Sequence, residues 1–324
     1  MRRALIVGDL GQDGSLLWEQ LREQGFGLAG LGRRGVRAHG VAVPEAASIA
    51  DVGQLRALLT ALRPDQVYYL AAHHSSSERS AESQAALWQQ SWAVNAEGLG
   101  NVLEAVAGTC PEAGVFYASS SRVFGTSDRP WVDETTPLRP ACAYGVTKAS
   151  GMLLADYYVR ERGLRVASGI LFNHESPLRG PSFVSRRVVD GLLALKRGRT
   201  ATLELGTLEA RVDWGYAPDY TRAMQALLDG RHSGAFVIAS GELHSVREML
   251  SLAADVLDVD WEGRVVETSA RLGRPPQPLC GDATRLRRCT GWAPSVDFAQ
   301  MVGLLVEAAL AREKDPSVPA PPGG

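Results

Sequence analysis

Cysteine, net charge and long apolar runs are all scarce in this chain of 324 residues. Its four cysteines, Cys110, Cys142, Cys280 and Cys289, show no C-x-x-C spacing, which disfavours both a disulfide framework and a metal site. A formal net charge of −2 offers no basic surface for nucleic acid. No apolar run approaches the roughly 20 residues that span a bilayer, and no signal-peptide core follows the first methionine. We therefore expect a soluble, cytoplasmic protein that binds neither membranes nor nucleic acid.

Short apolar segments alternate with longer amphipathic ones through the first half of the chain. The pattern predicts buried strands and intervening helices, the strands at 4–8, 66–72, 114–120 and 165–172 and the helices at 14–24, 52–62, 92–106 and 144–162. This order is typical of an α/β protein with a Rossmann-type, doubly wound parallel sheet and a smaller C-terminal domain. After residue 173 the pattern loosens into loops that contain Pro and Gly. We expect one domain over 1–172, to which later segments return, a second over 173–313, and a disordered Pro/Gly-rich tail over 314–324.

A glycine-rich turn follows the first predicted strand. In "GDLGQDG", Gly8, Gly11 and Gly14 lie between a strand and a helix, where glycine lets the backbone turn sharply and approach a pyrophosphate. A tight turn that binds no ligand would show the same spacing. Because the turn opens a strand–helix–strand pattern, we expect it to bind a dinucleotide.

The segment after the second strand suggests which dinucleotide is bound. A cofactor without a 2′-phosphate favours an acidic residue here, to hold the ribose hydroxyls. The sequence "GLGRRG" instead provides Arg33 and Arg34. A solvated pair of arginines is one explanation, and a clamp for a 2′-phosphate is the other. The second explanation predicts NADP(H) rather than NAD(H).

A tyrosine and a lysine four residues apart form the second chemical motif, Tyr144 and Lys148 in "YGVTK". Residues four apart share one face of a helix, so the ammonium can lower the pKa of the phenol and help it exchange a proton with a carbinol or ketone. The pair alone occurs often by chance. It gains weight from the glycine turn and from the serines at 119–121, which end a predicted strand.

Together these stretches resemble the extended short-chain dehydrogenase/reductase superfamily and, within it, the GDP-mannose 4,6-dehydratase family. The resemblance covers nearly the whole chain. Its most specific segments are "GQDGS", "FYASSSRVFG", "ETTPLRPACAYGVTK", "GILFNHESPLRGPSFVSRR", "DWGYAPDY" and "GDATRLRRCTGW".

The resemblance implies a mechanism in which NADP⁺ takes hydride from C4 of a GDP-hexose, a glutamate takes the C5 proton, water leaves from C6 and hydride returns there. By position, Ser120 matches the hydroxyl of the catalytic triad, Tyr144 its base and Lys148 its partner. Arg122 stands where the family has the glutamate. A guanidinium stays protonated and offers no lone pair, and loss of a general base typically costs about 10²–10⁴-fold in rate. A relocated acid or base is therefore required for dehydration.

The resemblance also implies binding residues. For the cofactor these are Gly8, Gly11, Gln12, Asp13, Gly14, Arg33, Arg34, Asp51, Ala71, Ala72, Tyr144 and Lys148, and for the nucleotide sugar His73, Ser121, Asn173, Val184, Arg187, Arg211 and Arg274. His73 or His74 could supply an acid or base, although a buried histidine without a catalytic role explains either equally well. Val184 could simply pack, and Arg187 could be a helix-surface charge.

Three departures from the family pattern affect this expectation. Val212 replaces an arginine before "DWG", Gln277 replaces an acidic residue after "RP", and Ser48 replaces an acidic residue that faces the adenine. The first two put GDP-mannose itself in doubt as the substrate, and the third weakens only a detail of cofactor binding.

Several functions remain compatible with the sequence. The leading one is a dehydratase-like enzyme that acts at C4 of a GDP-hexose with NADP(H). Because of Arg122, a 4-keto-sugar reductase or epimerase is the alternative, and a non-catalytic nucleotide-sugar sensor is a remote one, disfavoured by the retention of Tyr144 and Lys148. The resemblance further implies a homodimer or homotetramer, paired through the helices at 92–106 and 144–162, with the "RRGVRA" loop of one subunit near the cofactor of another.

Overall fold

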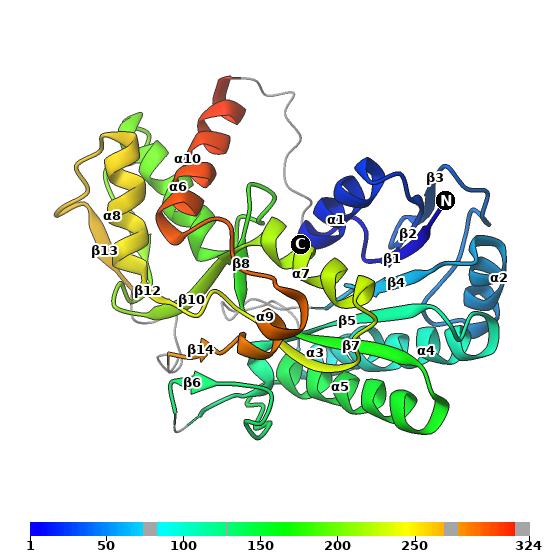
Figure 1. Cartoon of the computed structure of the whole chain (residues 1–324). Coiled ribbons are helices and arrows are strands. Elements are labelled where there is room, and N and C mark those ends of the chain that lie inside the picture. Colours follow the sequence, from blue (N-terminus) through cyan, green and yellow to red (C-terminus); the bar gives the residue numbers. More distant parts are fainter. Residues whose placement is uncertain (74–82, 128, 269–277, 315–324) are drawn as a thin grey trace.

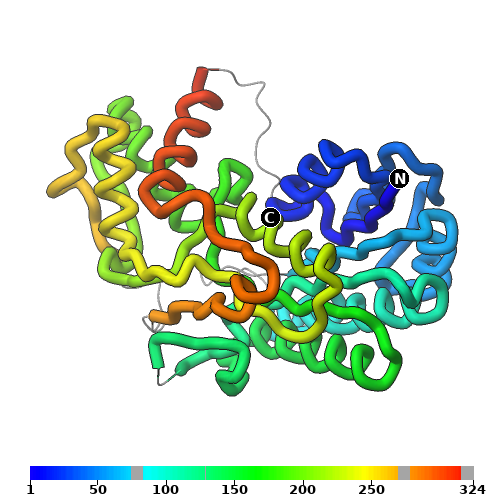
Figure 2. The backbone as a smooth tube through the Cα atoms, viewed as in Figure 1, coloured from blue at the N-terminus to red at the C-terminus, as the bar shows by residue number. Residues whose placement is uncertain are grey.

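The computed structural model describes residues 1–73, 83–127, 129–268 and 278–314. The chain forms two lobes, a larger one built on a central sheet and a smaller one made mostly of the later helices (Figure 1). The backbone trace shows that the chain crosses between the lobes more than once, because segments late in the sequence lie against the first lobe (Figure 2). The candidate site is built from segments of both lobes.

A seven-stranded sheet forms the centre of the larger lobe, in the order β11-β7-β5-β4-β1-β2-β3. Strands β11, β7, β5, β4, β1 and β2 all run parallel to one another. The strand bounds are β1 Arg3–Val7, β2 Gly27–Gly32, β3 Gly35–His39, β4 Gln66–Tyr69, β5 Gly114–Ser120, β7 Arg165–Leu171 and β11 Gly234–Ile238. The doubly wound parallel sheet expected from the sequence is therefore confirmed.

The edge strand β3 is the exception, because it runs antiparallel to β2. Only Arg33 and Arg34 separate the two strands. Two residues suffice for a hairpin, whereas a parallel neighbour needs a crossover of a dozen residues or more. The arginines therefore lie in the tip of a hairpin, and both are exposed.

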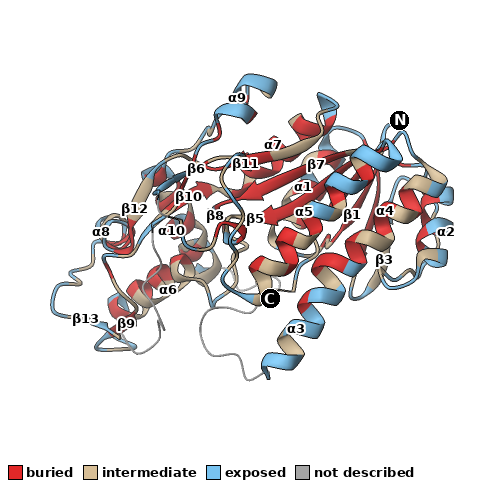
Figure 3. Ribbon diagram, turned by 90° about the horizontal axis from the view of Figure 1, so that it is seen from below, coloured by how far each residue is buried: buried red, intermediate tan, exposed pale blue. Residues whose placement is uncertain are grey.

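Helices cover both faces of this sheet (Figure 3). One face packs against α1 (Gln12–Glu23), α7 (Ala217–Asp229) and α9 (Thr284–Thr290), and the other against α2 (Val52–Leu62), α4 (Gly98–Thr109) and α5 (Ala143–Arg162). The strands alternate accordingly: Ala4 and Ile6 belong to the first core, and Leu5 and Val7 to the second.

The helix expected at 92–106 is part of a longer helical stretch. It comprises α3 (Gln84–Trp92), a π-helical turn (Ala93–Glu97) and α4. Such π turns are rare, and they occur frequently at functional sites.

The smaller lobe has its own apolar core, formed by α6 (Val184–Lys196), α8 (Val246–Leu257) and α10 (Phe298–Lys314) together with nearby strands. The strands of this lobe are β8 Asn173–Glu175, β9 Leu203–Leu205, β10 Arg211–Tyr216, β12 Leu243–Ser245 and β13 Val265–Glu267. The short connecting elements are β6 Trp131–Val132, β14 Cys280–Gly281 and the 3₁₀ turn Ser121–Val123. Lys314 ends α10, and the rest of the expected tail lies outside the described residues. Within the described ranges, no helix is both long and apolar enough to cross a membrane.

Candidate functional site

The glycine turn between β1 and α1 forms a tight backbone cradle. Gly8 has φ +90°, and a Cβ there would lie 2.6 Å from the backbone nitrogen of Ala71, in the loop after β4. A Cβ on Gly14 would overlap the Gly8 carbonyl oxygen. Gly11 precedes α1 in an extended conformation without a side-chain cap, so the first N–H groups of the helix face out of the turn. This geometry suits an anion such as a pyrophosphate.

Ser120, Tyr144 and Lys148 come together at the carboxyl end of β5. Ser120 is the last residue of β5, and its hydroxyl shares a hydrogen bond with the Tyr144 phenol, from the first turn of α5. Lys148 lies one turn later, almost fully buried, and its Nζ donates to the carbonyl of Ala118 at 2.8 Å. The ammonium is 5.7 Å from the centre of the Tyr144 ring. The spacing of four residues therefore places both groups in one cluster.

Burial determines the protonation of this cluster. Desolvation raises the pKa of Tyr144 to about 12, and the Ser120 hydrogen bond opposes the rise. Desolvation also lowers the pKa of Lys148 to about 7, and the Asp13 carboxylate opposes that fall. At neutral pH the phenol thus holds its proton, while the lysine lies near its titration point, where small electrostatic changes alter its charge.

A buried pair between Asp13 and His174 joins the glycine turn to the "FNHESP" segment. His174 Nε2 is 3.0 Å from both carboxylate oxygens of Asp13, its Nδ1 is 2.6 Å from the Phe172 carbonyl oxygen, and its ring stacks on Tyr220. Burial alone would lower the pKa of His174, but the Asp13 carboxylate raises it above its ordinary value. Burial alone would raise the pKa of Asp13, but His174 and then Arg179 hold it below its ordinary value. Each partner therefore favours the charged form of the other.

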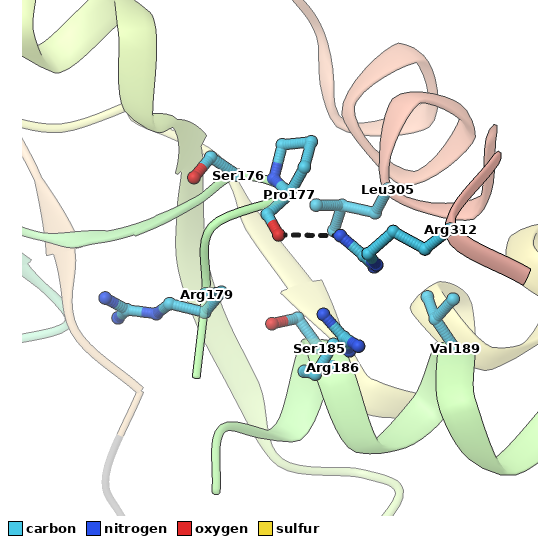
Figure 4. A pocket seen from close by; sticks show the side chains of 8 residues that line it. All are labelled: Ser176, Pro177, Arg179, Ser185, Arg186, Val189, Leu305 and Arg312. Atoms are coloured by element: carbon cyan, nitrogen blue, oxygen red, sulfur yellow. Dashed lines mark hydrogen bonds between the residues drawn. The ribbon is translucent and has the colours of Figure 1, made fainter. Parts of the chain in front are cut away.

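Arg179 adds a second guanidinium to the same region. Its Nε lies 3.1 Å from the buried carboxylate of Glu175, and its Cζ lies 3.7 Å from the centre of the Phe183 ring. Its charge favours ionisation of both Tyr144 and Asp13. The small cavity of about 10 Å³ beside it holds no more than a single water. In Figure 4 the Arg179 side chain extends away from Arg186 and Arg312, the other arginines of that cavity.

The π-helical turn supplies a polar anchor that sequence reasoning missed. Asn95 is fully buried; its Oδ1 accepts from the backbone N–H of His73 at 3.0 Å, and its Nδ2 donates to the Thr147 hydroxyl at 3.0 Å. It therefore fixes the loop after β4 against the residue next to Lys148. In the sequence, this anchor could have been recognised from Asn95, a polar residue at a core-facing position of an amphipathic helix pattern.

Arg122 follows the serines in the 3₁₀ turn and is exposed. No ion pair recorded for the described residues includes its guanidinium. Its neighbour Ser121 opens the same turn, whose backbone packs against α5: a Cβ on Gly145 would lie 2.5 Å from the Arg122 carbonyl oxygen. The nearby carboxylates make hydrogen bonds to other groups. Asp133 accepts from the backbone N–H of Thr135, and Glu134 accepts from the backbone N–H of Val237 at 2.7 Å.

The other candidates for sugar-nucleotide binding lie in the smaller lobe or beside it. Asn173 begins β8 and is exposed, Val184 begins α6 and partly packs in the core of that lobe, and Val212 is half-buried in β10. Arg187 donates to the Glu204 carbonyl at 2.9 Å and Arg211 to the Leu243 carbonyl at 3.0 Å. His74, Arg274 and Gln277 lie outside the described residues.

The remaining cofactor candidates are divided between the cradle and the surface. Gln12 donates to the His174 carbonyl at 3.1 Å, and Ala71 and Ala72 belong to the loop that meets Gly8. Asp51 is the N-cap of α2, and its carboxylate accepts from the Gln54 N–H at 3.0 Å. Sequence reasoning also missed Asp9 and Arg37, which form an ion pair beside the glycine turn. Across the residues described, no three His, Cys, Asp or Glu side chains are placed to hold a metal ion.

Comparison with known proteins finds sequence similarity to one enzyme family along nearly the whole chain. Residues 5–305 match the family model described as GDP-mannose 4,6 dehydratase. GDP-mannose 4,6 dehydratase 1 of Arabidopsis thaliana is 34% identical over 344 residues, covering 99% of this chain and 93% of its own length. The human GDP-mannose 4,6 dehydratase is 31% identical over 345 residues, covering 94% and 90%.

Solved structures share the fold. RMD from Pseudomonas aeruginosa, in complex with NADPH, matches with a TM-score of 0.81 at 23% identity, covering 96% of this chain and all of its own. DesIV from Streptomyces venezuelae, a dTDP-glucose 4,6-dehydratase, matches with a TM-score of 0.80 at 24% identity, covering 97% and 99%. The match over residues 5–305 and the relatives at 31–34% identity show that this protein belongs to the GDP-mannose 4,6-dehydratase family of nucleotide-sugar-modifying enzymes.

Proposed function

We propose that this protein binds NADP(H) and a GDP-hexose and promotes hydride exchange at C4 of the sugar. The cluster of Ser120, Tyr144 and Lys148 carries the proposal, because Ser120 hydrogen-bonds to Tyr144 and Lys148 Nζ lies 5.7 Å from the centre of the Tyr144 ring. The glycine cradle fits a dinucleotide, because Gly8 and Gly14 allow the close backbone contacts of the tight turn, and this turn leads into the start of α1 without a side-chain cap, where a pyrophosphate can bind. When bound, the nicotinamide supplies the hydride acceptor or donor.

The residues of this chain provide the proton chemistry. Tyr144 holds its proton at neutral pH, so it can donate to a C4 carbonyl oxygen, while Ser120 shares the hydrogen bond. The reverse step, removal of the C4 hydroxyl proton, requires a stabilised phenolate. A protonated Lys148 and the nearby Arg179 charge favour that phenolate.

Family membership favours dehydration as the overall reaction, since relatives at 31–34% identity bear the name GDP-mannose 4,6 dehydratase. Elimination across C5 and C6 needs a base at C5, which Arg122 cannot be. Asp133 and Glu134 are engaged with their own loop and with Val237. Arg122 is the reason to keep a second candidate beside dehydration, a reductase or epimerase of a 4-keto sugar, for which Ser120, Tyr144, Lys148 and the cofactor suffice.

For the nucleotide sugar we propose contacts from the segment that starts β8 and α6, including Asn173, Val184 and Arg187. Arg187 donates to the Glu204 carbonyl and Arg211 to the Leu243 carbonyl, which fixes both guanidinium groups beside this segment, and a guanidinium is suited to binding a phosphate. Val212 removes one guanidinium that the family places before "DWG", so we expect weaker discrimination for GDP-mannose.

We further propose a homo-oligomer that pairs through the helical stretch containing residues 92–106, extended to α3 at its start, and through α5. Large apolar side chains are exposed there: Trp88, Trp92, Leu153 and Tyr157 are 38%, 48%, 66% and 46% exposed. Exposed apolar residues that cluster on packed helices mark protein interfaces. A cytoplasmic location suits the four cysteines, which are all free thiols.

Two incubations of the purified protein test the proposed function. In the first, GDP-mannose is supplied with NADP⁺; in the second, GDP-4-keto-6-deoxymannose is supplied with NADPH. Loss of one water from the first nucleotide identifies a dehydratase, and gain of two hydrogens by the second, with stoichiometric NADPH oxidation, identifies a reductase. Absence of turnover in both, with nucleotide and cofactor bound, would contradict the proposal.

A further inference from the structure

The connection between β5 and α5 encloses a pocket of its own. The pocket has a volume of about 420 Å³, within the range of small-molecule sites. Its described lining residues lie between positions 124 and 139, apart from Asp282, and none of them belongs to the Ser120–Tyr144–Lys148 cluster. The lining includes both residues of β6, which Figure 1 shows beside β14. This pocket is therefore separate from the catalytic cluster.

Backbone hydrogen bonds hold the walls of this pocket in place. β6 pairs in parallel with β14, and the backbone N–H of Asp282 donates to the Val132 carbonyl at 2.9 Å. Near the other end of the connection, the backbone N–H of Arg139 donates to the Val123 carbonyl at 3.0 Å. Because both ends are fixed, a ligand has little of this backbone left to order, which lowers the entropic cost of binding.

Apolar side chains form part of the lining. Phe124 and Val132 line the pocket although each is only 1% exposed, so they form its base. Trp131 also lines it and is 57% exposed. An exposed tryptophan offers a large apolar ring face together with an N–H donor. The pocket can therefore receive a ligand that has an apolar face.

Asp133 provides the lining with an acceptor in a fixed position. Its Oδ1 accepts from the Thr135 backbone N–H at 2.9 Å, from the Thr135 hydroxyl at 2.7 Å and from the Thr136 hydroxyl at 3.1 Å. These bonds, that of the Thr135 hydroxyl first, hold the pKa of Asp133 below its ordinary value. An ionised carboxylate accepts hydrogen bonds through both oxygens, so Oδ2 can serve a hydroxyl of a ligand.

The charges of the described lining residues balance. Arg129 and Arg139 bring two positive charges, and Asp133 and Asp282 bring two negative ones. A phosphate would meet two carboxylates here, and an ammonium group would meet two guanidinium groups. A wholly apolar ligand would bury these groups and the Thr126 hydroxyl without partners, which is unfavourable. The lining therefore suits a neutral ligand with several hydroxyls and an apolar face.

We propose that this pocket binds a neutral sugar ring. A pyranose carries C–H groups on its faces and hydroxyls around its edge, so one face can lie on Trp131 while the hydroxyls bond to Asp133 and to the arginines. The pocket is a second sugar site, distinct from the proposed nucleotide-sugar site. It would bind sugar whether or not the catalytic cluster acts on a GDP-hexose.

Saturation-transfer NMR titrations of the full-length chain test this site without any turnover. The probes are the methyl α-pyranosides of mannose, glucose and galactose, and mannose 6-phosphate is the anionic comparison. We expect at least one neutral glycoside to bind with a Kd on the order of 1 mM, as is typical of a ligand of this size. Mannose 6-phosphate should bind more weakly, and added GDP-mannose should not displace the neutral glycoside.

Variants of the lining locate the bound glycoside. Trp131→Ala should weaken its binding by about 10-fold, because the aromatic face is lost, and Trp131→Phe should retain most of it. Trp88→Ala is the matched control, since Trp88 is also exposed but lies on α3. Asp133→Asn keeps an oxygen for the Thr135 N–H but loses the charge, and it should also weaken binding. Circular dichroism verifies that each variant is folded.

The proposal is overturned if none of the neutral glycosides binds at about ten times the expected Kd, or if a folded Trp131→Ala binds as the wild type does. Displacement by GDP-mannose would assign the glycoside to the nucleotide-sugar site, and tighter binding of mannose 6-phosphate would indicate an anion site; either result overturns the proposal. Glycoside binding without turnover of any GDP-hexose would contradict the proposed function alone.

Discussion

Replacement of His174 by leucine should destabilise the protein strongly, and in a manner that depends on pH. In the wild type, Nε2 of His174 lies 3.0 Å from both oxygens of Asp13, and the histidine is 7% exposed. His174→Leu leaves the Asp13 carboxylate buried without its main partner. Removing one member of a buried pair typically costs about 3–5 kcal/mol. Asp13→Asn is the matched control: with His174 neutral and its Nδ1–H donated to the Phe172 carbonyl, the asparagine amide N–H can donate to Nε2, so no charge is left buried and a cost of about 1 kcal/mol is expected.

The pH dependence follows from the two pKa shifts. The folded pKa of His174 is raised, so its contribution is fully present below the ordinary value of 6.5 and is lost as pH rises through the folded value. The folded pKa of Asp13 is lowered, so its contribution is present above the ordinary value of 3.8 and is lost as pH falls through the folded value. The difference between wild type and His174→Leu should therefore be largest between these two pH values and should shrink in alkaline buffer.

Urea denaturation, followed by far-UV circular dichroism at several pH values, measures this difference. The reasoning would be refuted by a loss below about 1 kcal/mol for His174→Leu near pH 5.5. It would be refuted equally by a loss that does not diminish at alkaline pH, because the stabilisation would then not depend on the charge of the histidine.

Four further predictions concern the active cluster and the surface. Tyr144→Phe should lower kcat by about 10²–10⁴-fold while leaving the Kd for NADP⁺ nearly unchanged; equal loss of both would indicate misfolding. Because burial lowers the pKa of Lys148 to about 7 and Asp13 opposes this, Asp13→Asn should shift the Lys148-dependent limb of the kcat–pH profile to lower pH; an unchanged limb would contradict the coupling. Arg122→Glu should raise dehydration of GDP-mannose by about 10²–10⁴-fold if the wild type has no other base, and a much smaller gain would reveal a relocated base. Leu153→Glu should dissociate the oligomer in light-scattering measurements, since Leu153 is 66% exposed on α5; an unchanged mass would move the interface elsewhere.

Local patterns predicted the larger lobe well, because its strands are short buried runs and its helices are amphipathic. The strand at 114–120 and the helix at 52–62 match β5 and α2 at both ends. The antiparallel β3 could not be read from apolar periodicity, since its residues are half-buried or exposed. The signal was the two-residue spacing after β2, which permits only a hairpin.

The smaller lobe was harder to predict. Helices α6, α8 and α10 bury their apolar faces against one another and against β9 and β10. In the sequence, these faces therefore appear as isolated hydrophobic residues among loops. Similarly, Tyr144 and Lys148 followed from helical spacing, whereas the pairing of Asp13 with His174 spans 161 residues of sequence and depends on tertiary contact alone.

The central claim is hydride exchange at C4 of a GDP-hexose through Tyr144, and a single-turnover experiment tests it most directly. Stoichiometric enzyme is mixed with NADP⁺ and GDP-mannose, and separately with NADPH and GDP-4-keto-6-deoxymannose, while the absorbance of reduced nicotinamide and the nucleotide masses are followed. The account predicts exchange with at least one of these nucleotides, slowed by about 10²–10⁴-fold in Tyr144→Phe. Binding of cofactor and both nucleotides without any change in absorbance or mass, or exchange in Tyr144→Phe at the rate of the wild type, would contradict it.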